Sequence, residues 1–325
     1  MLITRFGPDD LAATRFAISP LWETVTSRWA VHDPARHAIH LPWIKDANRA
    51  NKSSVLRPHK PLLEALIRPG AWLPDFLTPA PQTPLTTIQA ELAVLGATPA
   101  EIVREDLEVT HQQTPLTELG WQIHAEPERY LPAIVEALAT WWELAIAAVW
   151  PKLLTLLEAD IAFRTRTLAD YGPARMFAEL HPSLRWRDGR LEMEWGRDLE
   201  LELRGEGMPI APSIFLDNLP AFTVRPGSPV SMFYPVRAVG TLWERSVAPT
   251  GQPLVRLLGE TRARMLLILD APQTTSQLAA RLELAPGGIS AHLKVLRDAG
   301  LLTRHRQGKQ VLYLRTDLGH SLVDS

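Results

Sequence analysis

The stretch that decides the fold is TSQLAARLELAPGGISAHLKVLRDAGLLTRHRQGKQVLYLR, residues 275–315. Its first part has apolar residues at helical spacing, with Thr274 or Thr275 as the N-cap. After the turn 285–288, the spacing predicts a second helix from Ile289 to about Ala299. The last part alternates around Gln-Gly-Lys and predicts a two-stranded hairpin. A further apolar helix is expected just upstream, at 254–272.

The order helix, helix, turn, helix and basic hairpin is that of a winged helix-turn-helix. Ile289, Leu293 and Leu296 form one stripe at i, i+4 and i+7, which Ala299 extends by a turn and which packs on the preceding helices. A recognition helix presents its N-terminal turn to base edges in the major groove, here within 286–297. The residues then expected to project outward are Gly287, Ser290, Ala291 and Lys294.

Two glycines, Gly287 and Gly288, precede this helix, although each costs roughly 1 kcal/mol of helix stability relative to alanine. One explanation is that missing side chains let the backbone approach DNA and expose N–H groups at the positive end of the helix dipole. The other is that they only make a tight turn. Both explanations stay open on the sequence alone.

The hairpin, or wing, gathers basic side chains at its tip around Gly308. Such a wing contacts phosphates or enters the minor groove. Val311 and Tyr313 are expected to pack within the hairpin, and His292 to contact either a phosphate or the neighbouring helices. The predicted wing contacts are Arg304, His305, Arg306 and Lys309.

Charge is distributed unevenly along the chain. Residues 254–316 contain ten Lys and Arg against four Asp and Glu, a net charge of +6. Residues 1–253 contain 24 basic and 30 acidic side chains, a net charge of −6. A basic segment on an acidic body indicates a polyanionic partner for that segment alone.

The rest of the sequence predicts an α+β protein. Residues 1–180 read as mainly helical, and 184–234 as a small antiparallel sheet that includes a hairpin in LRWRDGRLEMEW (184–195). The proline and glycine of SVAPTGQP (246–253) predict a linker. We therefore expect a regulatory or dimerisation domain at 1–250 and a DNA-binding domain at 251–325.

The motifs ISAHLKVLRDAGL (289–301) and RQGKQVLY (306–313) resemble the winged helix of ArsR-type bacterial regulators, over about 70 of the 325 residues. SPLWETV, DPARHAIHLPWI, WLPDFLTP and AVGTLWE resemble a domain without settled function that precedes such winged helices in actinobacteria. The resemblance implies a homodimer that binds operator DNA, usually as a repressor, and releases it on a signal. The DNA-binding residues thus expected are Thr275, Gly287, Gly288, Ser290, Ala291, His292, Lys294, Arg304, His305, Arg306 and Lys309.

Metal sensing, which the resemblance also implies, is not expected here. The chain has no cysteine for a thiolate site, and Asp317 with His320 matches a carboxylate–histidine site poorly. His37 and His40 are one helical turn apart, but the sequence offers no firm fourth ligand, so a structural role is expected. We predict no bound metal and no cofactor.

No nucleotide-binding glycine loop, HExxH or GxSxG motif occurs, so we predict no enzymatic activity. All eleven tryptophans precede the winged helix. They form either an ordinary core and dimer interface or the lining of a pocket for a small apolar effector. The apolar run 131–158 is interrupted by charges and a proline, so no membrane span is expected.

The sequence thus predicts a cytoplasmic, homodimeric, sequence-specific transcription regulator, more typical of a repressor than of an activator. Its partners would be double-stranded operator DNA, a second copy of the chain and a small-molecule effector. The alternative is an enzyme, or a protein-interaction scaffold, that carries the winged helix as a targeting module.

Overall fold

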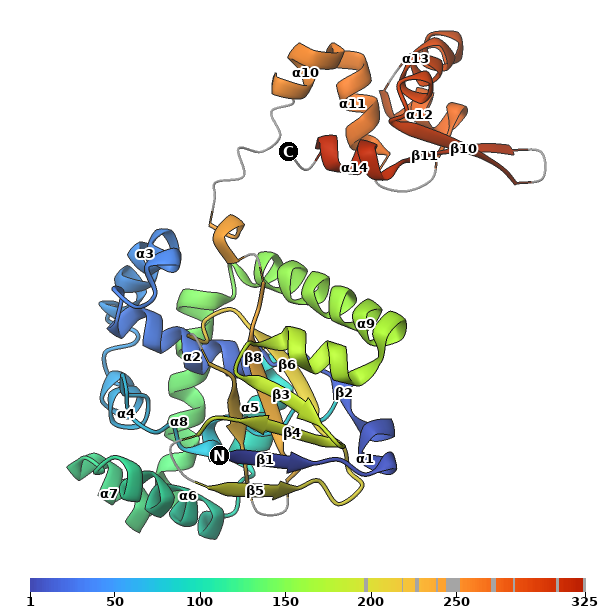
Figure 1. Cartoon of the computed structure of the whole chain (residues 1–325). Coiled ribbons are helices and arrows are strands. Elements are labelled where there is room, and N and C mark those ends of the chain that lie inside the picture. Colours follow the sequence, from blue (N-terminus) through green and yellow to red (C-terminus); the bar gives the residue numbers. More distant parts are fainter. Residues whose placement is uncertain are drawn as a thin grey trace. The chain divides into compact units, whose positions relative to one another are not determined.

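The computed structural model describes residues 1–195, 198–217, 219–225, 228–237, 239–243, 252–269, 273–282, 284–307 and 310–323. The chain forms two compact units, Met1–Glu244 and Arg245–Ser325 (Figure 1). The expected boundary at 250/251 and most of the expected linker lie outside the described residues.

The N-terminal unit is mainly helical, as expected. Side-chain caps begin several helices: Ser19 Oγ accepts from Trp22 N, and Thr117 Oγ1 accepts from Gly120 N. Proline occupies the first turn of others, where no N–H is needed. The helices are α1 (Pro8–Ala13), α2 (Pro20–His32), α3 (Leu41–Asn51), α4 (Lys60–Leu66), α5 (Ile88–Gly96), α6 (Ala100–Gln113), α7 (Glu118–Ala125), α8 (Pro127–Trp141), a π-helical turn (Trp142–Ile146) and α9 (Trp150–Leu180).

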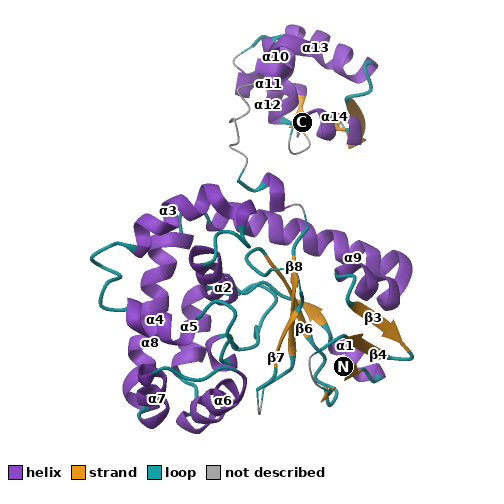
Figure 2. Ribbon diagram, turned by 60° about the vertical axis from the view of Figure 1, so that its left-hand side comes forward, coloured by secondary structure: helices purple, strands orange, loops and turns teal. Residues whose placement is uncertain are grey.

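Two four-stranded sheets complete this unit, and Figure 2 shows the second beside the helices. The first has the order β3-β4-β1-β5 and the second β2-β6-β8-β7. The strands are β1 (Leu2–Arg5), β2 (Arg15–Phe16), β3 (Leu184–Arg187), β4 (Arg190–Met193), β5 (Leu199–Glu202), β6 (Pro209–Ser213), β7 (Ala221–Thr223) and β8 (Ser231–Pro235).

The expectation of one small antiparallel sheet is wrong. β1 pairs antiparallel with β4 but parallel with β5, and β6 pairs parallel with both β2 and β8. The chain's first residues insert between strands almost 200 positions away, which local patterning does not reveal. The hairpin β3–β4 is confirmed: Asp188 and Gly189 both have positive φ, as its type of tight turn requires.

Among the described residues, no single helix is long and apolar enough to cross a membrane. One pair bent by 90°, Pro127–Ile146 with Trp150–Leu180, meets the length and composition criteria only when both are taken together. Many apolar side chains of this pair, including Trp141, Ile146 and Leu153, are buried in the core of the unit. This agrees with the expected buried helical region.

The histidines near the end of α2 do not form a metal cluster. The rings of His37 and His40 are 6.2 Å apart, and His40 Nδ1 accepts a hydrogen bond from Trp243 Nε1 at 2.8 Å. Within the described part of the chain, no group of three or more His, Asp or Glu side chains is placed to hold a metal ion.

A buried carboxyl group joins α2 to the second sheet. Glu23 is 1% exposed and accepts hydrogen bonds from the backbone N–H groups of Ile214 and Phe215, just after β6. Beside it, Trp22 Nε1 donates to Ser213 Oγ at 2.8 Å, and the indole stacks on Phe233. Burial raises the pKa of Glu23 to about 8, although these hydrogen bonds act in the opposite direction.

We expect Glu23→Gln to change how the stability of the N-terminal unit depends on pH. The folded pKa lies above the unfolded value of 4.5, so the native state binds the extra proton between these values. Wild-type stability is therefore lost as the pH rises from about 5 to about 8, by at most about 1.4 kcal/mol per pH unit, relative to Glu23→Gln.

Urea unfolding followed by tryptophan fluorescence measures this difference, because every tryptophan lies before residue 244. Other buried carboxyl groups, such as Glu91, are present in both proteins, so their contributions to the pH dependence of stability cancel in the difference. Parallel stability curves for the two proteins between pH 5 and pH 8.5 would contradict the assignment.

The C-terminal unit contains five helices and one three-stranded sheet of order β10-β11-β9 within its described residues. The expected single helix at 254–272 is wrong, because Gly259, at φ +82°, separates two helices. Neither β9 nor α14 was anticipated. The elements are α10 (Gln252–Leu258), α11 (Glu260–Ile268), β9 (Gln273–Thr274), α12 (Thr275–Leu282), α13 (Pro286–Asp298), β10 (Leu302–Gln307), β11 (Gln310–Arg315) and α14 (Asp317–Val323).

Candidate nucleic-acid interface

The inner face of α13 forms the expected apolar stripe. Ile289 and Leu293 are fully buried and Leu296 is 1% exposed. They share one core with side chains of α11 and α12, among them Leu266 and Leu278. Ala299 does not extend the stripe as expected, because the helix ends at Asp298 and Ala299 is exposed at its C-cap.

The opposite face of α13 is accessible. Gly287, Gly288, Ser290, Ala291 and Lys294 are all exposed, whereas His292 is half-buried at the edge of the core. Val295 is 46% exposed and lies on the same face. Val295 was not among the predicted outward residues, although its position at i+4 from Ala291 places it on this face of a helical wheel.

The two glycines lie inside the helix rather than in a turn before it. α13 begins at Pro286, with Ala285 as an N-cap whose side chain cannot accept a hydrogen bond. Neither glycine has positive φ, and a Cβ atom added to Gly287 or Gly288 meets nothing within 4 Å. Gly288 N donates to Ala285 O at 3.0 Å, so residues 285–288 do form a tight first turn of the helix. Neither backbone conformation nor packing within the described structure, however, requires glycine at these positions.

α12 begins with a reciprocal cap. Thr274 N donates to Gln277 Oε1 at 2.8 Å, and Gln277 N donates to Thr274 Oγ1 at 3.3 Å. Of the two expected caps, the structure thus has Thr274. Thr275 is the first residue of the helix and is half-buried.

The wing is a regular antiparallel hairpin that extends beyond the helices of its unit (Figure 1). β11 also pairs with β9, with Leu312 opposite Thr274 and Tyr313 opposite Gln273. This ties the wing to the start of α12. Both residues were expected to pack within the hairpin. Tyr313 instead packs partly against the core of the unit, and Val311 is 36% exposed.

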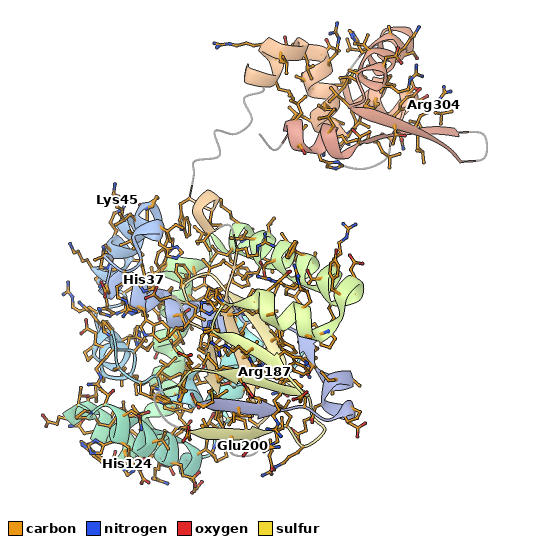
Figure 3. The ribbon with its side chains drawn as sticks, viewed as in Figure 1. His37, Lys45, His124, Arg187, Glu200 and Arg304 are labelled. Atoms are coloured by element: carbon orange, nitrogen blue, oxygen red, sulfur yellow. The ribbon has the colours of Figure 1, made fainter. Side chains whose placement is uncertain are left out.

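The basic residues of the wing are described to different extents. Arg304 is exposed and lies opposite Tyr313 in the ladder; Figure 3 labels it on the hairpin. His305 and Arg306 belong to β10, but their side chains lie outside the described residues, as do Gly308 and Lys309 altogether.

The segment before α14 contacts the turn that follows α13. Thr316 N donates to Leu301 O, and Thr316 Oγ1 donates to Gly300 O at 2.7 Å. α14 then approaches so closely that a Cβ atom on Gly319 would lie 2.2 Å from Leu301 O. Glycine is therefore required at 319 by packing, in contrast to 287 and 288.

The packed helices α11, α12 and α13, with one exposed helix face and a paired wing, have the architecture of a winged helix-turn-helix. Residues 257–305 match the family model of a helix-turn-helix domain. The C-terminal unit is a winged helix-turn-helix domain. No curated protein matches the chain.

Two solved structures are similar to part of the chain. Reduced HlyU from Vibrio cholerae N16961 is 26% identical, over 26% of this chain and 90% of that chain, with a TM-score of 0.20. A second HlyU structure from the same organism is 23% identical, over 25% and 90% of the two chains, with a TM-score of 0.20.

We expect glycine substitutions to separate packing from exposure in the winged helix-turn-helix domain. Gly288→Ala should leave the domain as stable or stabilise it by up to about 1 kcal/mol, since alanine favours a helix and its Cβ meets no atom of the described residues within 4 Å. Gly319→Ala should destabilise it by about 1–3 kcal/mol through overpacking. Amide hydrogen exchange of α13 and α14 in the full chain measures both effects. Equal losses of protection in the two variants would contradict the exposed position of Gly288.

Proposed function

We propose that this protein is a homodimeric, sequence-specific transcription regulator of the ArsR type that acts as a repressor and has no enzymatic activity. The N-terminal turn of α13 reads base edges in the major groove of operator DNA. The observation that carries this proposal is the glycine pair on the exposed face of α13. Gly287 and Gly288 cost helix stability, and no contact among the described residues of the domain explains them.

Close approach of the helix backbone to a DNA duplex explains why glycine occupies positions 287 and 288. Without Cβ atoms, the first turn of α13 can lie against a groove wall, and its N–H groups face the DNA. Ser290, Ala291 and Lys294 then follow at spacings that reach successive base pairs, and Val295 offers an apolar contact to a thymine methyl group.

The wing supplies contacts to the DNA backbone. Arg304 is exposed on β10, and Arg306 and Lys309 follow it in a segment whose net charge is +6 over residues 254–316. We propose that these residues and His305 contact phosphates beside the half-site. Thr275, at the start of α12, and His292 are proposed to contact the flanking backbone.

Two exposed leucines support a dimer formed through this domain. Leu257 on α10 is 67% exposed and Leu318 on α14 is 58% exposed. Both helices pack on α11. A two-fold pair would bury these side chains and place two copies of α13 on a palindromic site.

The N-terminal unit is proposed to receive a small-molecule signal and pass it to the DNA-binding domain. Effector binding would lower operator affinity by favouring a dimer in which the two recognition helices are wrongly spaced. The concentration of tryptophan in this unit supports a ligand-binding role.

Selection of binding sites from random DNA, followed by equilibrium titration of variants, tests the proposed function. We expect Gly288→Ala to lose on the order of tenfold in operator affinity without loss of stability, because the added methyl group holds the backbone away. Lys294→Ala should relax base preference at one position of each half-site, whereas Arg304→Ala should weaken all sequences alike.

Arg166→Ala serves as the control, since Arg166 is an exposed arginine of the N-terminal unit. If Gly288→Ala binds the selected site as tightly as wild type, α13 does not read DNA through its first turn. If Arg304→Ala has no effect, the wing does not contact the backbone through this residue.

A further inference from the structure

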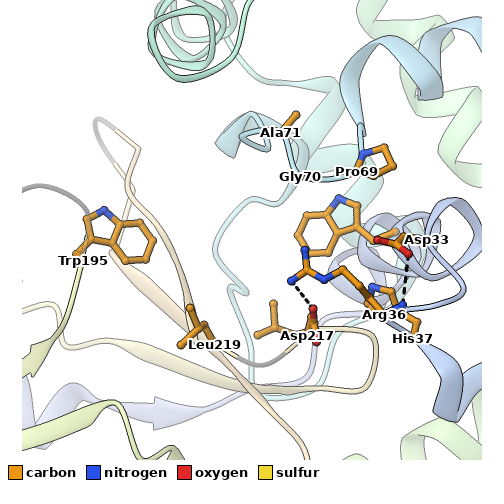
Figure 4. Close-up of a pocket in the computed structure, with 11 residues that line it drawn as sticks. Asp33, Arg36, His37, Pro69, Gly70, Ala71, Trp195, Asp217 and Leu219 are labelled. Carbon is orange, nitrogen blue, oxygen red and sulfur yellow. Dashed lines mark hydrogen bonds and ion pairs between the residues drawn. The ribbon is translucent and has the colours of Figure 1, made fainter.

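A cleft in the N-terminal unit lies between the end of α2, the segment 69–73 and the loop that follows β6. Its outer part has a volume of about 500 Å³. A smaller inner part of about 150 Å³ shares Trp29, Ala71 and Trp195 with it. Figure 4 shows Trp195 and Leu219 on one side, with Asp33, Arg36 and His37 on the other. This size is within the range of small-molecule sites.

Indole rings form much of the cleft's apolar lining. Trp29 and Trp195 line both parts, and Trp22 and Trp72 line the inner part. Trp72 meets Trp195 edge-on, with ring centroids 6.1 Å apart. Trp22 is fixed by its stacking on Phe233. Indole faces carry a negative electrostatic potential, so they attract organic cations as well as neutral aromatic groups.

The charges in the outer part also favour a cation. Asp33 and Asp217 contribute carboxylates, and among the described lining residues Arg36 is the one permanently charged base. Arg36 already forms an ion pair with Asp217 at 2.5 Å. Burial lowers the pKa of His37, which favours its neutral form. The described lining thus carries one excess negative charge.

The inner part adds a further acidic group. Asp75 accepts a hydrogen bond from Val224 N at 2.9 Å. Burial raises the pKa of Asp75 to about 7, so this carboxyl group is only partly ionised near neutral pH. A cation bound nearby would favour its charged form.

We propose that this cleft binds an apolar aromatic monocation. Its rings pack against Trp29 and Trp195, and its charge lies beside Asp217, where it replaces the guanidinium of Arg36. The Arg36 side chain is 61% exposed and can move into solvent. An aromatic anion would instead compete with Asp217 for Arg36. The claim that the cleft is the effector site of a regulator rests on the proposed function. The claim that it binds a cation does not.

Tetraphenylphosphonium and tetraphenylborate, which share a shape and differ in the sign of their charge, test this proposal on the full chain without DNA. Calorimetry and quenching of tryptophan fluorescence measure binding. We expect the phosphonium to bind on the order of tenfold more tightly than the borate. Arg36→Gln should tighten phosphonium binding several-fold, because it removes the competing cation. Asp217→Asn should weaken phosphonium binding by a similar factor.

The gain expected for Arg36→Gln separates the proposal from loss of folding, because a misfolded protein does not bind more tightly. Asp170→Asn, at an exposed carboxylate outside the cleft, is the control for Asp217→Asn. Tighter or equal binding of the borate, or weaker phosphonium binding by Arg36→Gln, would overturn the proposal. If the protein does not bind DNA, the proposed function fails, but binding of the phosphonium in the cleft still stands. If the cleft does not prefer the phosphonium, this proposal fails, but DNA binding still stands.

Discussion

The packing of the apolar face of α13 determines which side chains the C-terminal domain exposes to a binding partner. Ile289, Leu293 and Leu296 are removed from water against α11 and α12, and each such burial stabilises the domain by roughly 1.5–3 kcal/mol. Rotating α13 would expose this stripe, so the helix is held with Ser290, Ala291 and Lys294 outward. The pairing of β11 with β9 then holds the wing at the start of α12.

Buried polar contacts hold the N-terminal unit together in a comparable way. Tyr234 on β8 donates to Asp160 Oδ2 at 2.8 Å, and Arg164 on α9 pairs with the same oxygen. All three side chains are nearly inaccessible, so removing one would leave a buried charge or hydroxyl without its partner. Together with Glu23 on α2, this network fixes two helices to the second sheet and so supports one wall of the tryptophan-lined cleft.

Structural features that depend on residues close together in the chain could be predicted from the sequence. Features that depend on contacts between distant segments could not. The turn at Asp188 and Gly189, the wing and the apolar stripe of α13 follow from local spacing. The parallel pairing of β1 with β5 joins residues almost 200 positions apart, and the outer part of the cleft combines four separate segments. Local pattern also failed at Gly259, where a continuous apolar stripe crosses a residue with positive φ.

The candidate interface shows the same division. Helical spacing placed Ser290, Ala291 and Lys294 on the outer face, but it could not show where α13 begins. That depended on the first turn, where Pro286 starts the helix and both glycines adopt helical conformation. Only the three-dimensional surroundings show that a Cβ atom at Gly287 or Gly288 meets no described neighbour, whereas at Gly319 it would collide with Leu301 O.

The central claim is that the winged helix-turn-helix domain binds a DNA duplex through its positive charges and its exposed helix. The dependence of the full chain's DNA affinity on salt tests this claim most directly. A dimer that neutralises on the order of eight phosphates should lose several decades of affinity between 50 and 200 mM salt. An affinity that stays nearly constant over this range would contradict the claim.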